Sequence, residues 1–150
     1  MKKTEQTASG KNFTAVTVGK MSELGEHVLR IAPNFEIAGK VFVGQALQAT
    51  GAEMSFQRFE VGAETGFLHT HKTHEELYII IGGKGEFQVD GQIFEVSEGS
   101  VIRVAPNGRR SLRNTGHEAL TMICVQYKVA TFDASDASDG EILHEQVEWK

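Results

Sequence analysis

The sequence predicts an all-β protein built as one sandwich or barrel domain. The 150 residues are 40% hydrophobic, which is enough for a single core. Glycine is abundant, with 16 residues, and proline is rare, with 2. Short β-type runs separated by turn signals are typical of sandwiches and barrels. These runs cover residues 53–61, 67–71, 76–81, 86–89, 92–96, 101–104, 111–114 and 119–127.

Two glycine-containing segments indicate how neighbouring runs connect. Asp90-Gly91 separates two of the runs, and both residues tolerate the positive φ angles of a two-residue hairpin turn. The Gly-Gly-Lys-Gly segment at residues 82–85 marks another turn. Sequential strands are therefore expected to pair antiparallel.

The N-terminal part has weaker patterns. Residues 1–12 are polar and are expected to form a disordered tail. The barrel with its N-terminal additions then covers residues 13–130. Within it, residues 13–18 alternate like a strand, residues 21–31 favour a short helix, and residues 40–47 favour another strand.

Residues 131–150 are expected to form a C-terminal extension. Its first part, residues 134–140, is rich in Asp and Ser and is predicted to be a solvated linker. Four apolar side chains beyond the linker offer enough apolar surface to dock the C-terminus on some surface: Ile142, Leu143, Val147 and Trp149.

Charge and targeting signals narrow the choice of partners. The net charge is -5 and the Lys and Arg residues are scattered, so nucleic acid is excluded as a partner. The polar start lacks the apolar stretch of a secretory signal, and no apolar run approaches membrane-spanning length. We expect a cytoplasmic protein with no membrane partner. The single Cys124 lies in an apolar run and is predicted to be a buried, inert thiol.

The run at residues 77–81, Leu-Tyr-Ile-Ile-Ile, bears on assembly. It is apolar at both strand parities, whereas a sheet with one solvated face would alternate. Both faces are therefore expected to be covered, either by the N-terminal segment or by a second subunit. A homodimer is favoured.

A cluster of metal-ligand side chains lies between residues 69 and 76. Side chains at i and i+2 of a strand point to one face, so His69 and His71 can converge on one point. A four-residue turn then brings Glu76 to the start of the returning strand. Two imidazoles and a carboxylate suit a divalent transition metal such as Fe, Mn, Zn, Ni or Co. An isolated His-x-His pair would instead favour a solvated polar patch.

This cluster belongs to a longer pattern. One spaced string resembles the first conserved motif of the cupin superfamily: Gly62-x6-His69-x-His71-x4-Glu76-x6-Gly83. It has one more residue than usual between the leading glycine and the first histidine. Residues 75–86 are similar to the strand, glycine turn and return strand of that family, and the resemblance covers residues 53–127. It implies a double-stranded β-helix, or jelly-roll, barrel whose metal is bound by two His, one Glu and a further His.

The family's second motif, Gly-x5-Pro-x-Gly-x2-His-x3-Asn, donates that further histidine. Gly99 and Asn114 fix its register in this chain, and Arg110 then occupies the histidine position. The proline and the second glycine each stand one place later, at Pro106 and Gly108. A guanidinium is permanently charged and has no lone pair, so Arg110 cannot be a metal ligand.

Three interpretations of this substitution stay open. In the first, His69, His71 and Glu76 bind a metal, solvent completes its coordination, and Arg110 holds an anionic group of a substrate. In the second, no metal binds, Arg110 pairs with Glu76, and the histidines and Arg110 form a pocket for a carboxylate or phosphate. In the third, the charges neutralise one another in a barrel that binds nothing.

Other polar residues are secondary candidates. Tyr78 shares the strand parity of Glu76, and Gln126 is the amide in the last apolar run, so both are predicted to contact a substrate. Glu75 has the opposite parity and is expected to face outward. The remaining histidines are expected at the surface: His27, His74, His117 and His144.

Two functional hypotheses follow. The first is a metal-dependent enzyme of the oxygenase or isomerase type, which acts on a small anionic metabolite anchored by Arg110. Its metal, on His69, His71 and Glu76, would serve as a Lewis acid or bind O2. The alternative is a non-catalytic, metal-free small-molecule binding or sensing barrel with Arg110 as the anion anchor. The fold does not choose between them.

Overall fold

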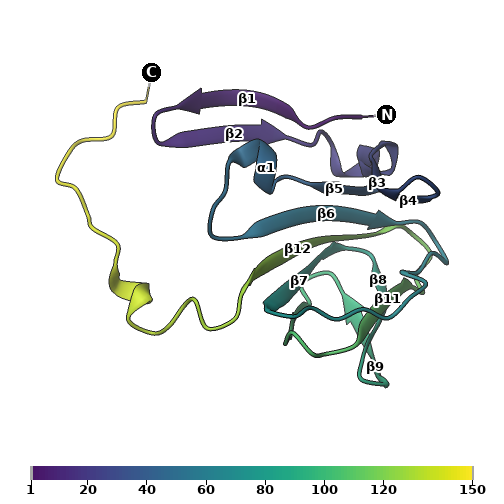
Figure 1. Cartoon of the computed structure of the whole chain (residues 1–150). Coiled ribbons are helices and arrows are strands. Elements are labelled where there is room, and N and C mark those ends of the chain that lie inside the picture. The colour runs from purple at the N-terminus through teal and green to yellow at the C-terminus, as the bar shows by residue number, and fades with distance from the viewer. Residues whose placement is uncertain (1, 150) are drawn as a thin grey trace.

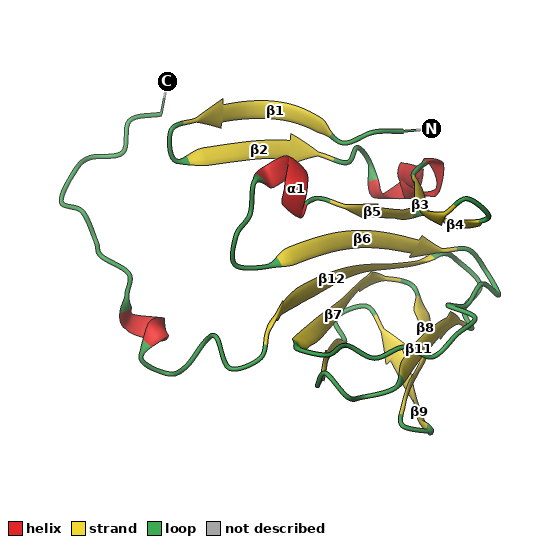
Figure 2. Cartoon of the chain, viewed as in Figure 1, coloured by secondary structure: helices red, strands yellow, loops and turns green. Residues whose placement is uncertain are grey.

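Two antiparallel sheets face each other and enclose the core (Figures 1 and 2). The computed structural model describes residues 2–149. The larger sheet has the strand order β10-β7-β12-β6-β5, and the smaller has the order β11-β8-β9. This arrangement confirms the predicted all-β jelly-roll fold. The strands are β5 (Lys40–Phe42), β6 (Glu53–Phe59), β7 (His74–Gly82), β8 (Lys84–Val89), β9 (Gln92–Ser97), β10 (Val101–Val104), β11 (Arg110–Asn114) and β12 (Leu120–Lys128).

The core lies between the sheets because buried and exposed residues alternate along the strands. In β11, for example, Leu112 is buried while Arg113 is exposed. Each strand of both sheets except β5 contributes to one apolar cluster, which consists of Phe59, Tyr78, Ile80, Phe87, Val96, Val104, Leu112, Leu120, Met122 and Cys124.

Both predicted turns are confirmed. Asp90 (φ 51°) and Gly91 (φ 85°) form the two-residue turn of the β8–β9 hairpin, in which Val89 pairs with Gln92. Gly83 (φ 77°) joins β7 to β8. A Cβ atom at Gly83 would lie 2.5 Å from the carbonyl oxygen of Ala119, so no other residue fits this turn.

The strand register places three rows of side chains on the inner face of the larger sheet. Residues directly opposite each other in an antiparallel pair share a face. One row holds Val104, Glu76 and Gln126, the next holds Ile102, Tyr78, Cys124, Ser55 and Phe42, and the third holds Ile80, Met122, Gln57 and Lys40.

The N-terminus forms a hairpin of β1 (Glu5–Gly10) and β2 (Phe13–Thr17). The prediction of a disordered tail over residues 1–12 is therefore wrong for the residues described. All residues of β1 are exposed. Pairing with β2 satisfies the backbone groups on one edge of β1, and solvent satisfies the other edge, so this strand forms without the apolar side chains that the prediction required.

The helix predicted over residues 21–31 is wrong in its second half. A 3-10 helix, η1 (Met21–Glu26), ends there, and the chain extends into β3 (Val28–Ala32), which pairs with β4 (Phe35–Ala38). The β-branched residues of β3 favour extended backbone.

Two further N-terminal predictions are also corrected. The strand predicted over residues 40–47 ends at Phe42, and α1 (Gly44–Leu47) follows. His27 is buried rather than at the surface, and its Nε2 lies 2.9 Å from the carbonyl oxygen of Val18. That hydrogen bond satisfies the imidazole inside the N-terminal part.

The C-terminal extension leaves the domain after β12 and contains only a short 3-10 helix, η2 (Asp136–Ser138) (Figure 1). Its apolar residues do not dock on this domain, since their exposed fractions run from 67% for Leu143 to 92% for Trp149. The last backbone hydrogen bond from this end to the domain is donated by Val129 to Thr73, within residues 2–149. No helix in that range is long and apolar enough to cross a membrane.

The outer face of the larger sheet is covered only in part. Over β6, Met54 and Phe56 pack against a second, smaller core that the N-terminal segment forms. Over β7 and β12, Leu77, Ile79, Ile81, Ile123 and Val125 are only half-buried, and Val101 on β10 is exposed. The N-terminal segment therefore accounts for one part of the predicted cover, and the rest of this face is uncovered within residues 2–149.

We propose that a second copy of the chain covers this face. Val101→Glu would place a charge in such an interface, so we expect it to convert a dimer to a monomer in light-scattering measurements on a sizing column. Ile93→Glu is the matched control, because Ile93 is 56% exposed on β9 and Val101 is 63% exposed. A parent protein with the mass of one chain would contradict the dimer.

Candidate metal centre and ligand cavity

His69 and His71 lie in the segment between β6 and β7, where two backbone contacts hold them. His69 forms an isolated bridge with Arg110, and the His71 N–H donates to the carbonyl of Pro106 at 2.9 Å. Residues 67–71 therefore do not form the predicted strand. The two rings nevertheless converge, with centroids 5.6 Å apart and planes at 88°.

Glu76 lies opposite the two histidines on the inner face of β7 and is buried. Its Oε1 atom lies 3.1 Å from Nε2 of His71, and its Oε2 atom lies 3.7 Å from Nε2 of His69. The Cys124 thiol also contacts Oε1, at 3.5 Å. The structure thus brings together the three side chains that the sequence predicts as a cluster, and their donor atoms lie within 4.8 Å of one another.

Arg110 lies beside this cluster and is 1% exposed. Its Nε and Nη2 atoms donate to Oε2 of Glu76 at 2.9 and 2.7 Å. Its Nη1 atom donates to the carbonyl of Gly108 at 2.8 Å. Tyr78 donates its hydroxyl proton to the same Oε2 atom. The positive charge of Arg110 is therefore matched inside the protein, as the second interpretation of the sequence expects.

The protonation states follow from burial and charge. Burial would raise the pKa of Glu76, but contacts with His69, Tyr78 and Arg110 outweigh it and hold that pKa well below its usual range. Burial lowers the pKa of His71, with Arg110 adding to the shift. Burial and the Glu76 charge raise the pKa of the Cys124 thiol. At neutral pH the site contains an ionised carboxylate, a neutral His71 and the inert thiol that the sequence predicts.

The donor set fits a divalent transition metal. Among the described residues, two buried imidazole nitrogens have no hydrogen-bond partner, His69 Nδ1 and His71 Nε2. The second of them lies 3.1 Å from Glu76 Oε1. A neutral imidazole nitrogen with a free lone pair is what such a metal requires. Glu76 Oε1 is the carboxylate oxygen that Arg110 and Tyr78 do not use.

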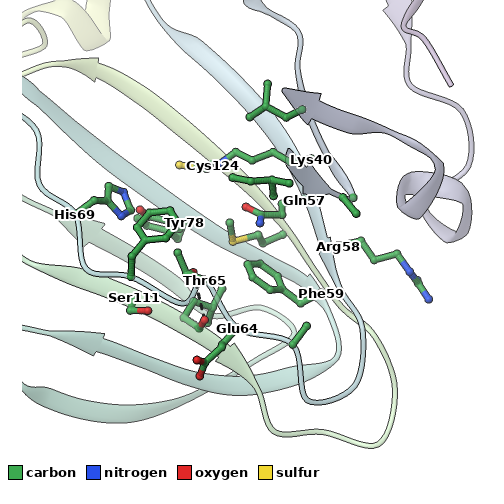
Figure 3. A pocket seen from close by; sticks show the side chains of 18 of the residues that line it. Lys40, Gln57, Arg58, Phe59, Glu64, Thr65, His69, Tyr78, Ser111 and Cys124 are labelled. Carbon is green, nitrogen blue, oxygen red and sulfur yellow. Dashed lines mark hydrogen bonds between the residues drawn. The ribbon is translucent and has the colours of Figure 1, made fainter. Parts of the chain in front are cut away.

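A cavity of about 740 Å³ opens beside the cluster (Figure 3). His69, His71 and Glu76 form part of its wall, and most of the rest is apolar. The β3–β4 hairpin lies along its mouth, where the ring of Phe35 lies 6.0 Å from that of Phe67. This volume falls within the range of sites for metabolites of moderate size.

The predicted substrate-binding residues all line this cavity: Arg110, Tyr78 and Gln126. Their contact with a substrate stays a prediction. Glu75 faces outward as expected and pairs with Arg103. His74 and the last two histidines are exposed, as predicted.

The sequence did not point to Lys40 or Gln57, which also line the cavity. Lys40 pairs directly with Gln57 across β5 and β6, so the two side chains share the inner face. In Figure 3 the Lys40 side chain extends toward Cys124. The sequence feature that could have pointed to Lys40 is its i, i+2 spacing from Phe42, which places both side chains on one face of a strand. In the structure the Lys40 amine lies 5.2 Å from the centre of the Phe42 ring.

The buried ion pair yields a stability prediction. Glu76→Gln leaves the Arg110 charge buried without its counter-ion, which costs about 3–5 kcal/mol. Glu75→Gln is the matched control, because its partner Arg103 is 54% exposed and remains solvated without a counter-ion, so a smaller loss is expected. Urea denaturation in the presence of EDTA measures both losses. Equal losses in the two variants would show that Arg110 does not depend on Glu76.

Comparisons with known proteins agree with this architecture. The family model of the cupin domain matches residues 55–126. The uncharacterized protein MJ1618 of Methanocaldococcus jannaschii is 37% identical over 67 residues, which are 45% of this chain and 53% of that protein. The chain therefore spans about half the length of this relative.

Solved structures extend the likeness beyond the matched segment. A cupin protein, BF4112, from Bacteroides fragilis superposes with a TM-score of 0.66 at 30% identity, over 77% of this chain and 94% of that one. A predicted oxalate decarboxylase from Thermotoga maritima superposes with a TM-score of 0.57 at 21% identity, over 73% and 97% of the two chains, which shows a shared fold. With its two facing sheets and first-motif residues in place, the chain belongs to the cupin family.

Proposed function

We propose that this cupin binds a divalent transition metal through His69, His71 and Glu76, and takes a small anionic organic molecule into the adjoining cavity. The observation that carries the proposal is the pair of converging imidazoles, in which the buried Nε2 of His71 has no hydrogen-bond partner among the described residues. It faces the Glu76 oxygen that no guanidinium or hydroxyl occupies. An enzyme of the oxygenase or isomerase type is the activity that such a site would serve.

Different residues of the site would have different roles in this function. A bound metal would supply Lewis-acid chemistry toward an oxygen of the substrate. Arg110 and Tyr78 hold Oε2 of Glu76 and thereby fix the direction of Oε1. The Phe67 ring lies 5.9 Å from the His69 ring in the cavity wall, where it would limit the access of water to the metal ligands.

The competing function is a non-catalytic, metal-free binding barrel. The observation in its favour is the Arg110–Glu76 pair, which neutralises the cluster without a metal. In that protein the imidazoles and Arg110 would bind the anion directly, and added metal would change neither ligand binding nor thermal stability.

Metal binding is tested by titration. We expect protein purified without a His-tag, then stripped with EDTA, to bind one divalent ion per chain by calorimetry. His71→Ala should weaken binding by more than about tenfold, because even the loss of an outer partner costs that much. His144→Ala, an exposed residue of the C-terminal extension, should leave binding unchanged. Equal affinities in the parent and His71→Ala would contradict the proposed metal site.

Arg110 provides a second test. Its positive charge repels a cation beside Glu76, so Arg110→Met should raise metal affinity about tenfold or more. Arg110→His should raise it further, because it supplies the fourth imidazole at the position predicted from the second motif. Arg109→Met, at an exposed neighbouring position, is the control. A decrease in affinity for both Arg110 variants would mean that the guanidinium positions Glu76 more than it repels the metal.

A further inference from the structure

Most charged side chains that line the cavity form ion pairs, and Lys40 is the exception in its interior. Arg110 pairs with Glu76, Arg58 with Glu60, and Glu36 with Arg30. Within residues 2–149, Lys40 is the cation of the cavity wall that has no carboxylate within 4.0 Å. Glu64 is unpaired as well, but it is exposed at the rim.

The polar neighbour of Lys40, Gln57, also has a side chain that donates no hydrogen bond to another described residue. Gln57 lies directly opposite Lys40 on β6 and is buried, and neither side chain donates a hydrogen bond to another described residue. Side chains directly opposite in an antiparallel pair have Cβ atoms about 5 Å apart. An ammonium and an amide at this spacing can each donate to one oxygen of the same carboxylate. Burial lowers the pKa of Lys40 and outweighs the more distant Glu76 charge, which raises it; an incoming anion would also raise it.

The β3–β4 hairpin, which ends two residues before Lys40, supplies an apolar wall of the cavity. Leu29 on β3 pairs directly with Ile37 on β4, so their side chains share one face of the hairpin, and both line the cavity. Neither residue belongs to either core cluster. Phe35 and Ile31 continue this apolar wall to the mouth, where both are exposed. Apart from the contact between Phe35 and Phe67, the hairpin thus offers its apolar side chains to the cavity.

We propose that the cavity binds an amphipathic carboxylic acid, with its carboxylate on Lys40 and Gln57 and its aliphatic or aromatic body on the β3–β4 hairpin. This assignment rests on the proposed function of the cavity and names its ligand class. One ammonium matches one negative charge, whereas a phosphate dianion would leave charge unpaired against an apolar wall. Lys40 on β5 and Glu76 on β7 are separated in the sheet by β6 and β12, so the far end of the ligand can face the metal ligands.

The test uses straight-chain carboxylates from butyrate to decanoate as probes, with the full chain both stripped of metal and loaded with it. Calorimetry should show affinity rising about fourfold for each added methylene, until the hairpin wall is covered. Lys40→Met should weaken octanoate binding at least tenfold and leave metal affinity unchanged. Lys40→Arg should restore part of the loss. Lys72→Met, an exposed lysine, is the control for general charge.

Two results would overturn the assignment. One is an affinity that does not change with chain length. The other is octanoate binding that His71→Ala abolishes and Lys40→Met leaves intact, because the carboxylate would then lie on the metal. Failure of the metal proposal gives a different pattern, in which no divalent ion binds but the loss in Lys40→Met persists. Ligand and metal are thus tested separately.

Discussion

The ion pair between Glu76 and Arg110 constrains the whole interior of this barrel. Glu76 belongs to the larger sheet and Arg110 to the smaller one, so the pair joins the two sheets at the polar end of an otherwise apolar core. Arg110 also forms the backbone bridge that positions His69. A buried pair of this kind is costly to break because either partner alone would be an uncompensated charge. The residue at the family's fourth-ligand position therefore organises the site without being able to ligate a metal.

The fold and the polar cluster could be predicted from the sequence because their signals are local. Alternating apolar residues identify the strands, and Asp90-Gly91 identifies a turn that only a few residue types can form. The approach of His69, His71 and Glu76 follows from their short spacing along the chain. It survives even though residues 67–71 form no strand, since single contacts with Arg110 and Pro106 hold the two histidines in place.

The rest depends on pairing between distant segments, which local patterns do not specify. Lys40 and Phe42 have the same parity, but only the pairing of β5 with β6 decides that this face is the inner one. The cavity mouth likewise depends on the β3–β4 hairpin, whose first strand lies in a segment that the pattern predicts as helix. The exposed β1 strand has no apolar signal at all, because backbone pairing with β2 maintains it.

The first two interpretations of Arg110, metal binding and an internal ion pair, are compatible in this geometry. They use different oxygens of one carboxylate, since Arg110 and Tyr78 bind Oε2 while Oε1 faces His71. The structure changes where an anionic ligand is expected to bind, from Arg110 to Lys40. Because Glu76 matches the charge of Arg110, an anionic ligand gains little from that guanidinium, and the unpaired Lys40 determines where negative charge is accepted. The metal ligands and the anion site then lie at separate parts of one cavity, and the separation between them determines the length of the molecule that can reach both.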